Sequence, residues 1–473
     1  MKRFFDLRRY LPSSTVYKYF SNLSLKLSNS SLCFPNREKM KLELEVTSEE
    51  LVKPSSPTPA NLRRYKLSFL DQVTADVYNP MVYFYQLNRD SNFTKIQIKN
   101  HLKNTLSAVL SDYYPLAGRV NYADFVIDCN DDGIPFLETR VKFNLHDVVS
   151  RSFPEDLNCL VPFELDRLNE ISMGVQLNFF ECGGIGLGVC VSHKIADALS
   201  FFSVVNSWAR AARGEAEAIG RPHLVAAKLF PPRNAAVYNT GNSIVRDRVA
   251  RRFVIDGSKV EAIREKYAER AAMEGQRRPT KVEALSAFIY GRFLAAIEDE
   301  SSAQTDRLFL VCHTVNIRQK LDPPLPQNAF GNYYRNAMTL PSAQTLADPN
   351  CCALVNEVRL QIAKINAEFL RQFQEENAQV EIIKATSARF AKGEIVSCAF
   401  TSLCRFPLYD ADFGWGSPLW AASPALPFKN LVVFMDTKSG DGAVDAIVHL
   451  KESHMKRFEV DCEFLKFASP TAF

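Results

Sequence analysis

The stretch VSHKIADALSFF, residues 191–202, joins two different patterns of apolar residues. The chain leading into it, VQLNFFECGGIGLGVCVSH, predicts two short strands separated by a turn at Gly183 and Gly184. The chain that follows, ALSFFSVVNSWARAAR, has helical apolar spacing and contains neither Gly nor Pro. His193 therefore lies where a strand gives way to a helix, with Asp197 four positions further on.

Strands and helices also alternate on either side of this junction. TKIQIKNHLKNTLSAVLSDYY predicts a helix, because Ile98, Leu102 and Leu106 repeat at helical spacing. ADFVIDCNDDGIPFLETRV, RRFVID, RLFLVCHTVNI, KNLVVFMDT and GAVDAIVHL predict further strands. Thr280 and Glu283 have the spacing of a helix capping box. The chain is therefore expected to be of the α/β class.

Length and composition indicate at least two domains. The chain has 473 residues, of which 47% are hydrophobic, and a single domain typically takes roughly 150. Residues 212–245 collect Gly, Pro and Asn and lose all periodicity, which predicts a long crossover loop. We therefore expect an N-terminal domain at 40–211, this loop, and a C-terminal domain at 246–473.

The first 39 residues differ from the rest. They hold eight Lys/Arg, two acidic residues and seven Ser, a bias like that of organelle transit peptides. Met40 opens a segment that looks like an ordinary domain start, so residues 1–39 equally fit an upstream extension of a cytosolic protein. We expect a cytoplasmic protein, or a plastid or mitochondrial one if residues 1–39 act as a transit peptide.

Charge and cysteine content exclude several classes of partner. Lys+Arg 57 against Asp+Glu 53 gives a formal net charge of +4, too small in a chain this long to indicate nucleic-acid or membrane-surface binding. No uncharged apolar run reaches the length of about 18 residues that a transmembrane helix needs. The 11 cysteines form no CxxC pair, so neither a zinc site nor a disulfide framework is indicated. We expect a soluble, metal-free protein whose partner is a small molecule.

The candidate chemistry centres on His193. Of the seven histidines, only this one lies at a strand end beside small residues with a carboxylate nearby. Such a position can expose a general base to a cleft, although a lone histidine is also common as a structural residue. Asp197 could orient the His193 ring or point away toward a basic partner. GxSxG, Walker A and HExxH motifs are missing, and GGIGLG runs into a strand rather than a helix. The remaining candidate is a histidine base without a protein nucleophile.

A second motif, DFGWG at residues 412–416, reduces the number of functions that fit the sequence. HxxxD followed by DFGWG, in this order and separation, resembles the BAHD acyl-CoA-dependent acyltransferases of plants. Further matches are YPLAGR, CNDDG and NIRQKLDPPLPQNAFGN. The resemblance covers about residue 45 to the C-terminus, and within the family it is nearest to the alcohol acetyltransferases that act on alkaloids and terpenoids.

The resemblance implies a fold and an activity. The fold is two similar chloramphenicol-acetyltransferase-like domains, with a channel between them that admits acyl-CoA from one side and the acceptor from the other. His193 would remove the acceptor's proton so that its oxygen attacks the thioester directly. We expect a monomeric O-acyltransferase that uses acetyl-CoA as co-substrate, with no permanently bound cofactor. The alternatives are a hydroxycinnamoyl- or benzoyl-CoA transferase, an N-acyltransferase, or a catalytically silent binding protein on the same fold.

The resemblance also implies roles around the channel. Asp197 would turn away from the acceptor and pair with an arginine, for which Arg318 is the candidate. Lys281, Ser402 and Arg405 lie in segments that match family stretches near the CoA, where cations and hydroxyls can meet phosphates. A solvated surface charge is the alternative for these three.

The DFGWG motif contains Asp412, Gly414, Trp415 and Gly416. Two glycines among bulky neighbours predict a tight backbone bend, and the resemblance implies a structural rather than a catalytic role for the motif. We expect Trp415 to border the channel.

Overall fold

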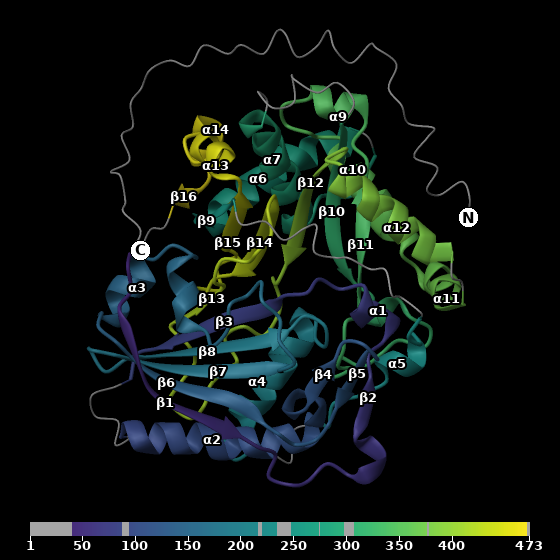
Figure 1. The fold of residues 1–473 in the computed structure, drawn as a ribbon. Helices are drawn as coiled ribbons and strands as arrows, with labels where there is room; N and C mark the ends of the chain where they lie inside the picture. The colour runs from purple at the N-terminus through teal and green to yellow at the C-terminus, as the bar shows by residue number, and fades with distance from the viewer. Residues whose placement is uncertain are drawn as a thin grey trace.

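The computed structural model describes residues 40–87, 94–215, 220–233, 247–273, 275–297, 307–375 and 378–470. Two large β-sheets dominate it, one built mainly by the first half of the chain and one by the second. Figure 1 shows the first sheet in the lower half of the view and the second in the upper half. The expectation for residues 1–39 lies outside the described residues, as does part of the predicted crossover at 212–245.

The first sheet has the order β1-β6-β7-β8-β3-β13. Its strands are β1 (Leu44–Val52), β3 (Tyr78–Tyr85), β6 (Ile134–Val141), β7 (Met173–Phe180), β8 (Ile185–Ser192) and β13 (Trp420–Ala422). The predicted strands β7 and β8 are present and buried along their whole length. β13 pairs antiparallel with β3, so the second half of the chain supplies an edge strand to the sheet of the first half.

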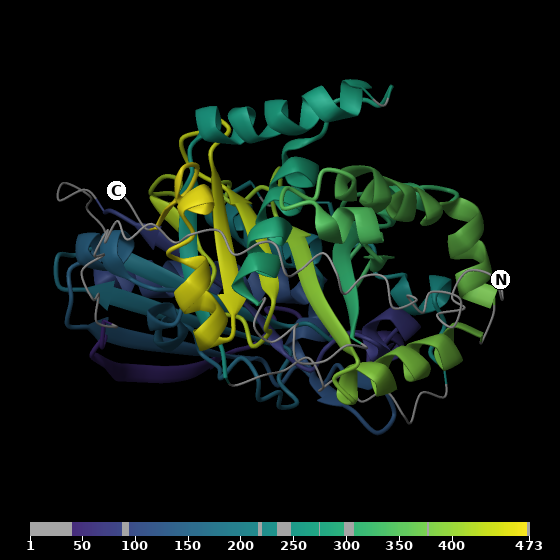
Figure 2. The ribbon, with the colours of Figure 1, turned by 90° about the horizontal axis from the view of Figure 1, so that it is seen from above.

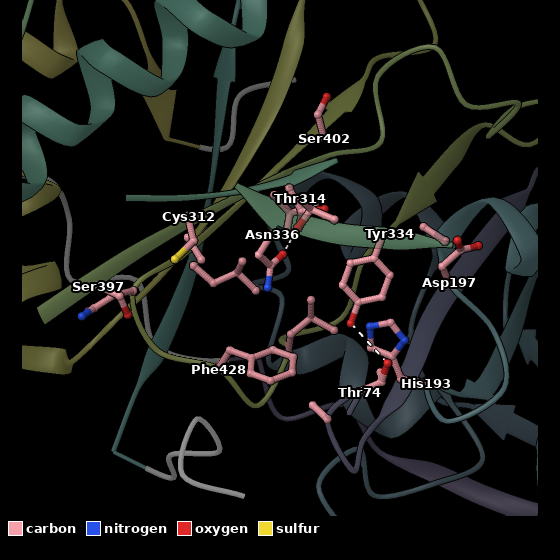
Figure 3. Close-up of a pocket in the computed structure, with 18 of the residues that line it drawn as sticks. Thr74, His193, Asp197, Cys312, Thr314, Tyr334, Asn336, Ser397, Ser402 and Phe428 are labelled. Carbon is pink, nitrogen blue, oxygen red and sulfur yellow. Dashed lines mark hydrogen bonds between the residues drawn. The ribbon is translucent and has the colours of Figure 1, made fainter. Parts of the chain in front are cut away.

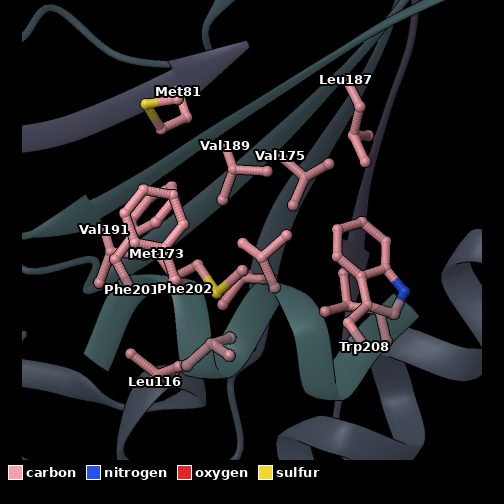
Figure 4. Close-up of a cluster of buried hydrophobic side chains, with 14 of the residues drawn as sticks. Met81, Leu116, Met173, Val175, Leu187, Val189, Val191, Phe201, Phe202 and Trp208 are labelled. Carbon is pink, nitrogen blue, oxygen red and sulfur yellow. The ribbon is translucent and has the colours of Figure 1, made fainter. Parts of the chain in front are cut away.

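Two helices pack against this sheet and against each other, α2 (Lys95–Asp112) and α4 (Ala198–Ala212). Both helices were predicted from their apolar spacing and are confirmed. The Trp208 indole on α4 is fully buried, and its Nε1–H donates to the Leu102 carbonyl of α2 at 3.1 Å. Figure 4 shows the side chains that meet between α4 and the strands, among them Phe201, Phe202, Trp208, Val175, Leu187 and Val189. This packing fixes the helix that begins just after His193.

The second sheet has the order β11-β10-β12-β14-β15-β9-β16. Its strands are β9 (Val249–Ile255), β10 (Leu308–Asn316), β11 (Tyr334–Thr339), β12 (Ile395–Ser402), β14 (Leu431–Asp436), β15 (Val444–Leu450) and β16 (Ser469–Pro470). Strands β10, β12 and β14 are parallel to one another, and the other pairs are antiparallel. The strands predicted at β9, β10, β14 and β15 are confirmed.

Helices of the second half surround this sheet. They are α6 (Gly257–Met273), α7 (Lys281–Ala296), α9 (Ala343–Ala347), α10 (Leu354–Lys364), α11 (Ala367–Glu375), α12 (Ala378–Ala391), α13 (Glu452–Phe458) and α14 (Cys462–Leu465). The predicted capping box of α7 is present, with Thr280 accepting from the Glu283 N–H and Glu283 accepting from the Thr280 N–H. Seen from above, the helices α10–α12 lie beside the β10–β11 edge of the sheet (Figure 2).

Smaller elements complete the fold. A three-stranded sheet has the order β2-β5-β4, with β2 (Arg64–Lys66), β4 (Arg119–Asn121) and β5 (Val126–Asp128). The short helices are α1 (Phe69–Gln72), α3 (Leu145–Arg151) and α5 (Ala226–Leu229), of which α5 lies within the predicted crossover. Across the described part of the chain, none of the helices combines the length and apolar character needed to cross a membrane.

Candidate active site

Both halves of the chain contribute to one cavity of about 1190 Å³. Six residues predicted from the sequence line it, namely His193, Asp197, Lys281, Arg318, Ser402 and Arg405. The cavity exceeds the roughly 300–1,000 Å³ typical of a site for one drug-sized ligand. Two substrates can therefore be held together beside His193.

The hydrogen bonds of the His193 ring determine its tautomer. Nδ1 lies 3.1 Å from the main-chain carbonyl oxygen of Ala196. Because a carbonyl only accepts, Nδ1 must carry the proton, and Nε2 keeps its lone pair. No described residue hydrogen-bonds Nε2, and the ring lines the cavity. The arrangement presents an unprotonated nitrogen to the cavity, as a general base requires.

The surroundings favour the neutral form of this ring. Burial lowers the pKa of His193 below its ordinary value, and the nearby Lys194 ammonium acts in the same direction. The Ala196 carbonyl and the Asp197 carboxylate oppose this shift without reversing it. His193 is therefore unprotonated and able to accept a proton at neutral pH.

The Tyr334 ring stacks on His193, with ring centroids 5.6 Å apart and planes inclined by 25°. Its hydroxyl donates to Thr74 Oγ1 at 3.4 Å, and the Thr74 hydroxyl in turn donates to the Leu70 carbonyl at 2.8 Å. Figure 3 shows the hydrogen bond from the Tyr334 hydroxyl to Thr74 as a dashed line beside the imidazole. Tyr334 was not among the residues predicted for the site. Its only signal was its place just after the NAFGN stretch.

The carboxylate of Asp197 points away from the imidazole and accepts four hydrogen bonds. Arg318 donates two of them, from Nη1 to Oδ2 at 2.7 Å and from Nη2 to Oδ1 at 2.9 Å. The main-chain N–H groups of Ser200 and Tyr333 donate the others, at 2.9 Å and 3.0 Å. The expected pairing with Arg318 is therefore present. Through Ser200, Asp197 also caps the N-terminus of α4.

Arg318 is the buried counterpart of this carboxylate. It is 1% exposed, and the other hydrogen bonds of its guanidinium go to main-chain, hydroxyl and amide oxygens. Nε and Nη2 donate to the Ala329 carbonyl at 3.1 and 3.0 Å, and Nη2 also donates to Ser200 Oγ at 3.0 Å. The pair thus ties α4 to the loop that leads into β11.

The main chain of His193 is held from both sides. Its N–H donates to the Val77 carbonyl at 2.8 Å, and its carbonyl accepts from Asn332 Nδ2 at 2.7 Å. Asn332 Nδ2 also donates to Asp71 Oδ1 at 2.8 Å. Burial raises the pKa of Asp71 to about 6, although hydrogen bonds from Ser68 and Asn332 oppose the rise. Neither Asp71 nor Asn332 was predicted as a site residue.

The DFGWG motif forms a turn. Gly414 and Gly416 have φ angles of 104° and 99°, a left-handed conformation that favours glycine. Asp412 Oδ1 accepts from both of their N–H groups, at 2.9 and 2.8 Å. The carboxylate is thus committed to holding the bend.

Trp415 lies elsewhere than expected. Its ring stacks on Phe413, with centroids 5.9 Å apart, and meets Tyr85 edge-on at 6.1 Å. Neither it nor any other residue of the motif is among the described residues that line the cavity. The expectation that Trp415 borders the channel is therefore wrong, because the turn docks onto the core of the first half of the chain.

Two of the three candidate CoA contacts, Lys281 and Arg405, meet at one carboxylate, that of Asp436. It pairs with the Lys281 ammonium and accepts from the Arg405 N–H at 2.6 Å. Burial alone would raise the pKa of Asp436. Lys281 and this N–H outweigh burial and hold that pKa below its ordinary value. The Arg405 side chain is exposed and has no acidic partner in the described part of the chain. Arg405 and Ser402 therefore offer more available donors to an anion than Lys281 does.

No metal centre accompanies these groups in the described ranges, where His, Cys, Asp and Glu nowhere gather in a set of three or more that could hold an ion.

Comparison with known proteins identifies relatives over most of the chain. The model of the Transferase family matches residues 42–465. Stemmadenine O-acetyltransferase of Catharanthus roseus is 34% identical over 429 residues, which cover 89% of this chain and 97% of that protein. A limonoid 21-O-acetyltransferase of Melia azedarach is 34% identical, with 91% of this chain and 99% of that protein covered. The crystal structure of vinorine synthase matches with a TM-score of 0.77 at 33% identity, covering 91% and 99% of the two chains.

Proposed function

Because the chain belongs to the Transferase family, the BAHD acyltransferases, we propose that it transfers an acetyl group from acetyl-CoA to a hydroxyl of an alkaloid or terpenoid. The protein is an acyltransferase. The choice of an acetyl donor and an alcohol acceptor is supported by the names of its relatives, which include O-acetyltransferases for stemmadenine and for limonoids.

The observation that carries the proposal is the tautomer of His193. Its Nδ1–H is committed to the Ala196 carbonyl, so Nε2 is available to a substrate in the cavity. Nε2 takes the proton of the acceptor hydroxyl while the hydroxyl oxygen attacks the thioester carbonyl carbon. The tetrahedral oxyanion then collapses, the C–S bond breaks, and the departing CoA thiolate recovers the proton from the imidazolium.

Direct transfer requires both substrates in one place. A single cavity reaches from His193 to Ser402 and Arg405. When the acyl-CoA and the acceptor are both bound there, the transfer takes place within one complex and needs no further collision between molecules. In this arrangement the Arg405 guanidinium and the Ser402 hydroxyl bind phosphate oxygens of CoA. Lys281 contributes less, because Asp436 already neutralises its charge.

The test incubates purified protein with a panel of acyl-CoAs and of alkaloid and terpenoid alcohols, and follows free thiol release together with the mass of the ester. The proposal expects thiol release that depends on the alcohol and is fastest with acetyl-CoA. Preference for hydroxycinnamoyl- or benzoyl-CoA, or for amine acceptors, would replace the proposed substrates with those. Binding of acyl-CoA without transfer to any acceptor would identify a silent binding protein.

A further inference from the structure

Thr314 and Asn336 form a polar pair on the wall of the cavity. They lie directly opposite each other on β10 and β11, and both are exposed residues that line the cavity. The Thr314 hydroxyl donates to Asn336 Oδ1 at 3.4 Å. In this arrangement the nitrogen is the end of the Asn336 amide that faces outward. In Figure 3 the Asn336 nitrogen points away from Thr314, into the space between this wall and Phe428.

A second amide on the same wall, that of Asn316, also has an engaged oxygen and a nitrogen without a described partner. Asn316 also lines the cavity and is exposed. Its Oδ1 accepts from the N–H and from Nη1 of Arg318, at 3.0 and 3.3 Å. Neither Asn316 Nδ2 nor Asn336 Nδ2 donates to any described residue. Both amides therefore present N–H donors to the cavity while their oxygens are occupied.

This donor-only character separates the two amides from the hydroxyls nearby. Ser397 and Thr401 also line the cavity, but a hydroxyl can rotate to donate or to accept, so it imposes no choice on a ligand. The nitrogen of an amide can only donate, and it is the nitrogen that Asn336 and Asn316 leave without a described partner. A ligand that covers Asn336 without offering an oxygen would leave the N–H groups of the amide without a hydrogen-bond partner. Binding of such a ligand is weakened.

The place of Asn336 on β11 determines how far it lies from the reacting atoms at His193. It lies on the same face of β11 as Tyr334, two residues along the strand, a separation of about 7 Å. Tyr334 in turn stacks on His193. A molecule with fused rings can therefore place a hydroxyl at His193 Nε2 and another oxygen at the Asn336 amide. Because the amide carries no formal charge, a neutral oxygen is sufficient to pair with its N–H groups.

We propose that Asn336, oriented by Thr314, selects acyl acceptors that carry a ketone, ester or ether oxygen on the ring system that bears the acylated hydroxyl. Asn316 adds a second donor to this subsite. The inference rests on the proposed function, since it concerns the acceptor of the same transfer reaction.

The test uses polycyclic alcohols in matched pairs, in which a ring ketone of one member is replaced by a methylene in the other, with acetyl-CoA as donor. The wild-type protein should prefer the ketone. Asn336→Asp keeps the shape of the side chain but replaces the N–H donors with an acceptor. It should lower kcat/KM for the ketone by about 5- to 100-fold, leaving KM for acetyl-CoA and the rate with the methylene alcohol close to wild type.

Two further variants keep the test decisive. Thr314→Val removes the group that orients the amide and should reduce the preference for the ketone in the same direction by a smaller factor. Ser397→Ala, a polar-to-apolar change on a neighbouring strand of the same wall, should leave the ratio of the two rates unchanged.

Equal wild-type rates for both members of every pair would overturn the inference. So would an Asn336→Asp variant that slows both members equally, or one that instead raises KM for acetyl-CoA, which would assign the amide to the donor. If no alcohol is acylated with any acyl-CoA, the proposed function itself fails, and that result is distinct from acylation without preference.

Discussion

The guanidinium of Arg318 holds the carboxylate of Asp197 through two parallel hydrogen bonds of 2.7 and 2.9 Å. The two residues are 1% and 6% exposed. The same carboxylate accepts the N–H of Tyr333, the residue before the one that stacks on His193. Asp197 therefore acts on His193 by fixing the elements around it, namely the start of α4 and the segment that carries Tyr334.

Breaking this ion pair should lower both stability and activity. Asp197→Ala and Arg318→Ala each leave a buried charge without its partner, which typically costs about 3 to 5 kcal/mol. Because both changes remove the same interaction, the double variant should lose less stability than the two single losses added together. Denaturant unfolding and turnover, measured on all three variants, check this.

The pair Arg252–Asp445 is a matched control, since it is also buried and has a 3.0 Å contact. Asp445→Asn should lower the free energy of unfolding without slowing the molecules that remain folded. Additive losses in the Asp197/Arg318 cycle, with both single variants as stable as wild type, would contradict the account.

Tyr334 is expected to position the base. Tyr334→Ala removes the ring that stacks on His193, and a small displacement of a catalytic group can cost up to about 100-fold in rate. We expect kcat to fall about 10- to 100-fold, with KM for acyl-CoA unchanged. The opened site should also return the His193 pKa toward its ordinary value, so the acid limb of the rate profile should move to higher pH. Tyr334→Phe keeps the ring and should retain most of the rate. An unchanged pH profile in Tyr334→Ala would show that the stacking has no effect on the base.

Variants at Asp412 test whether the carboxylate of the DFGWG turn has a structural role. Asp412→Asn retains an oxygen that can accept from Gly414 and Gly416, so it should fold and turn over much like wild type. Asp412→Ala removes that oxygen and should lower the free energy of unfolding by about 1 to 3 kcal/mol. Melting temperature and turnover distinguish the two variants. An inactive but thermally normal Asp412→Asn would point to a catalytic carboxylate instead.

The strand-to-helix junction at His193 could be predicted because its signals are local. The apolar run of β8, the helical spacing of α4 and the capping box of α7 each depend on residues close together in the chain. The left-handed glycines of DFGWG were likewise predictable from residue type. For these elements, sequence and structure agree.

Contacts between distant segments could not be predicted from local patterns. β13 has three residues, too few to show a period, and its partner β3 lies in the other half of the chain. Tyr334, Asp71 and Asn332 reach His193 across more than a hundred residues of sequence. Their roles emerge only once the two halves of the chain are packed together.

The dependence of kcat/KM on pH should reflect His193. The reaction needs Nε2 unprotonated, so the rate should fall as pH drops through the pKa of this ring. Burial lowers that pKa, which places the acid limb below about 6.5, the ordinary value for histidine. Asp71, with a pKa of about 6, is the competing group. Asp71→Asn should therefore leave the limb in place, whereas an acid limb above pH 7, or one that disappears in Asp71→Asn, would contradict the assignment.

The central claim is that His193 is the general base of an acyl transfer without a covalent intermediate. Its most direct test is the rate of alcohol-dependent thiol release by His193→Ala, measured beside its melting temperature. Because general-base catalysis contributes about 10²- to 10⁴-fold, the account predicts a loss of that size in a protein that melts like wild type. A correctly folded His193→Ala variant that releases thiol at close to the wild-type rate would contradict it.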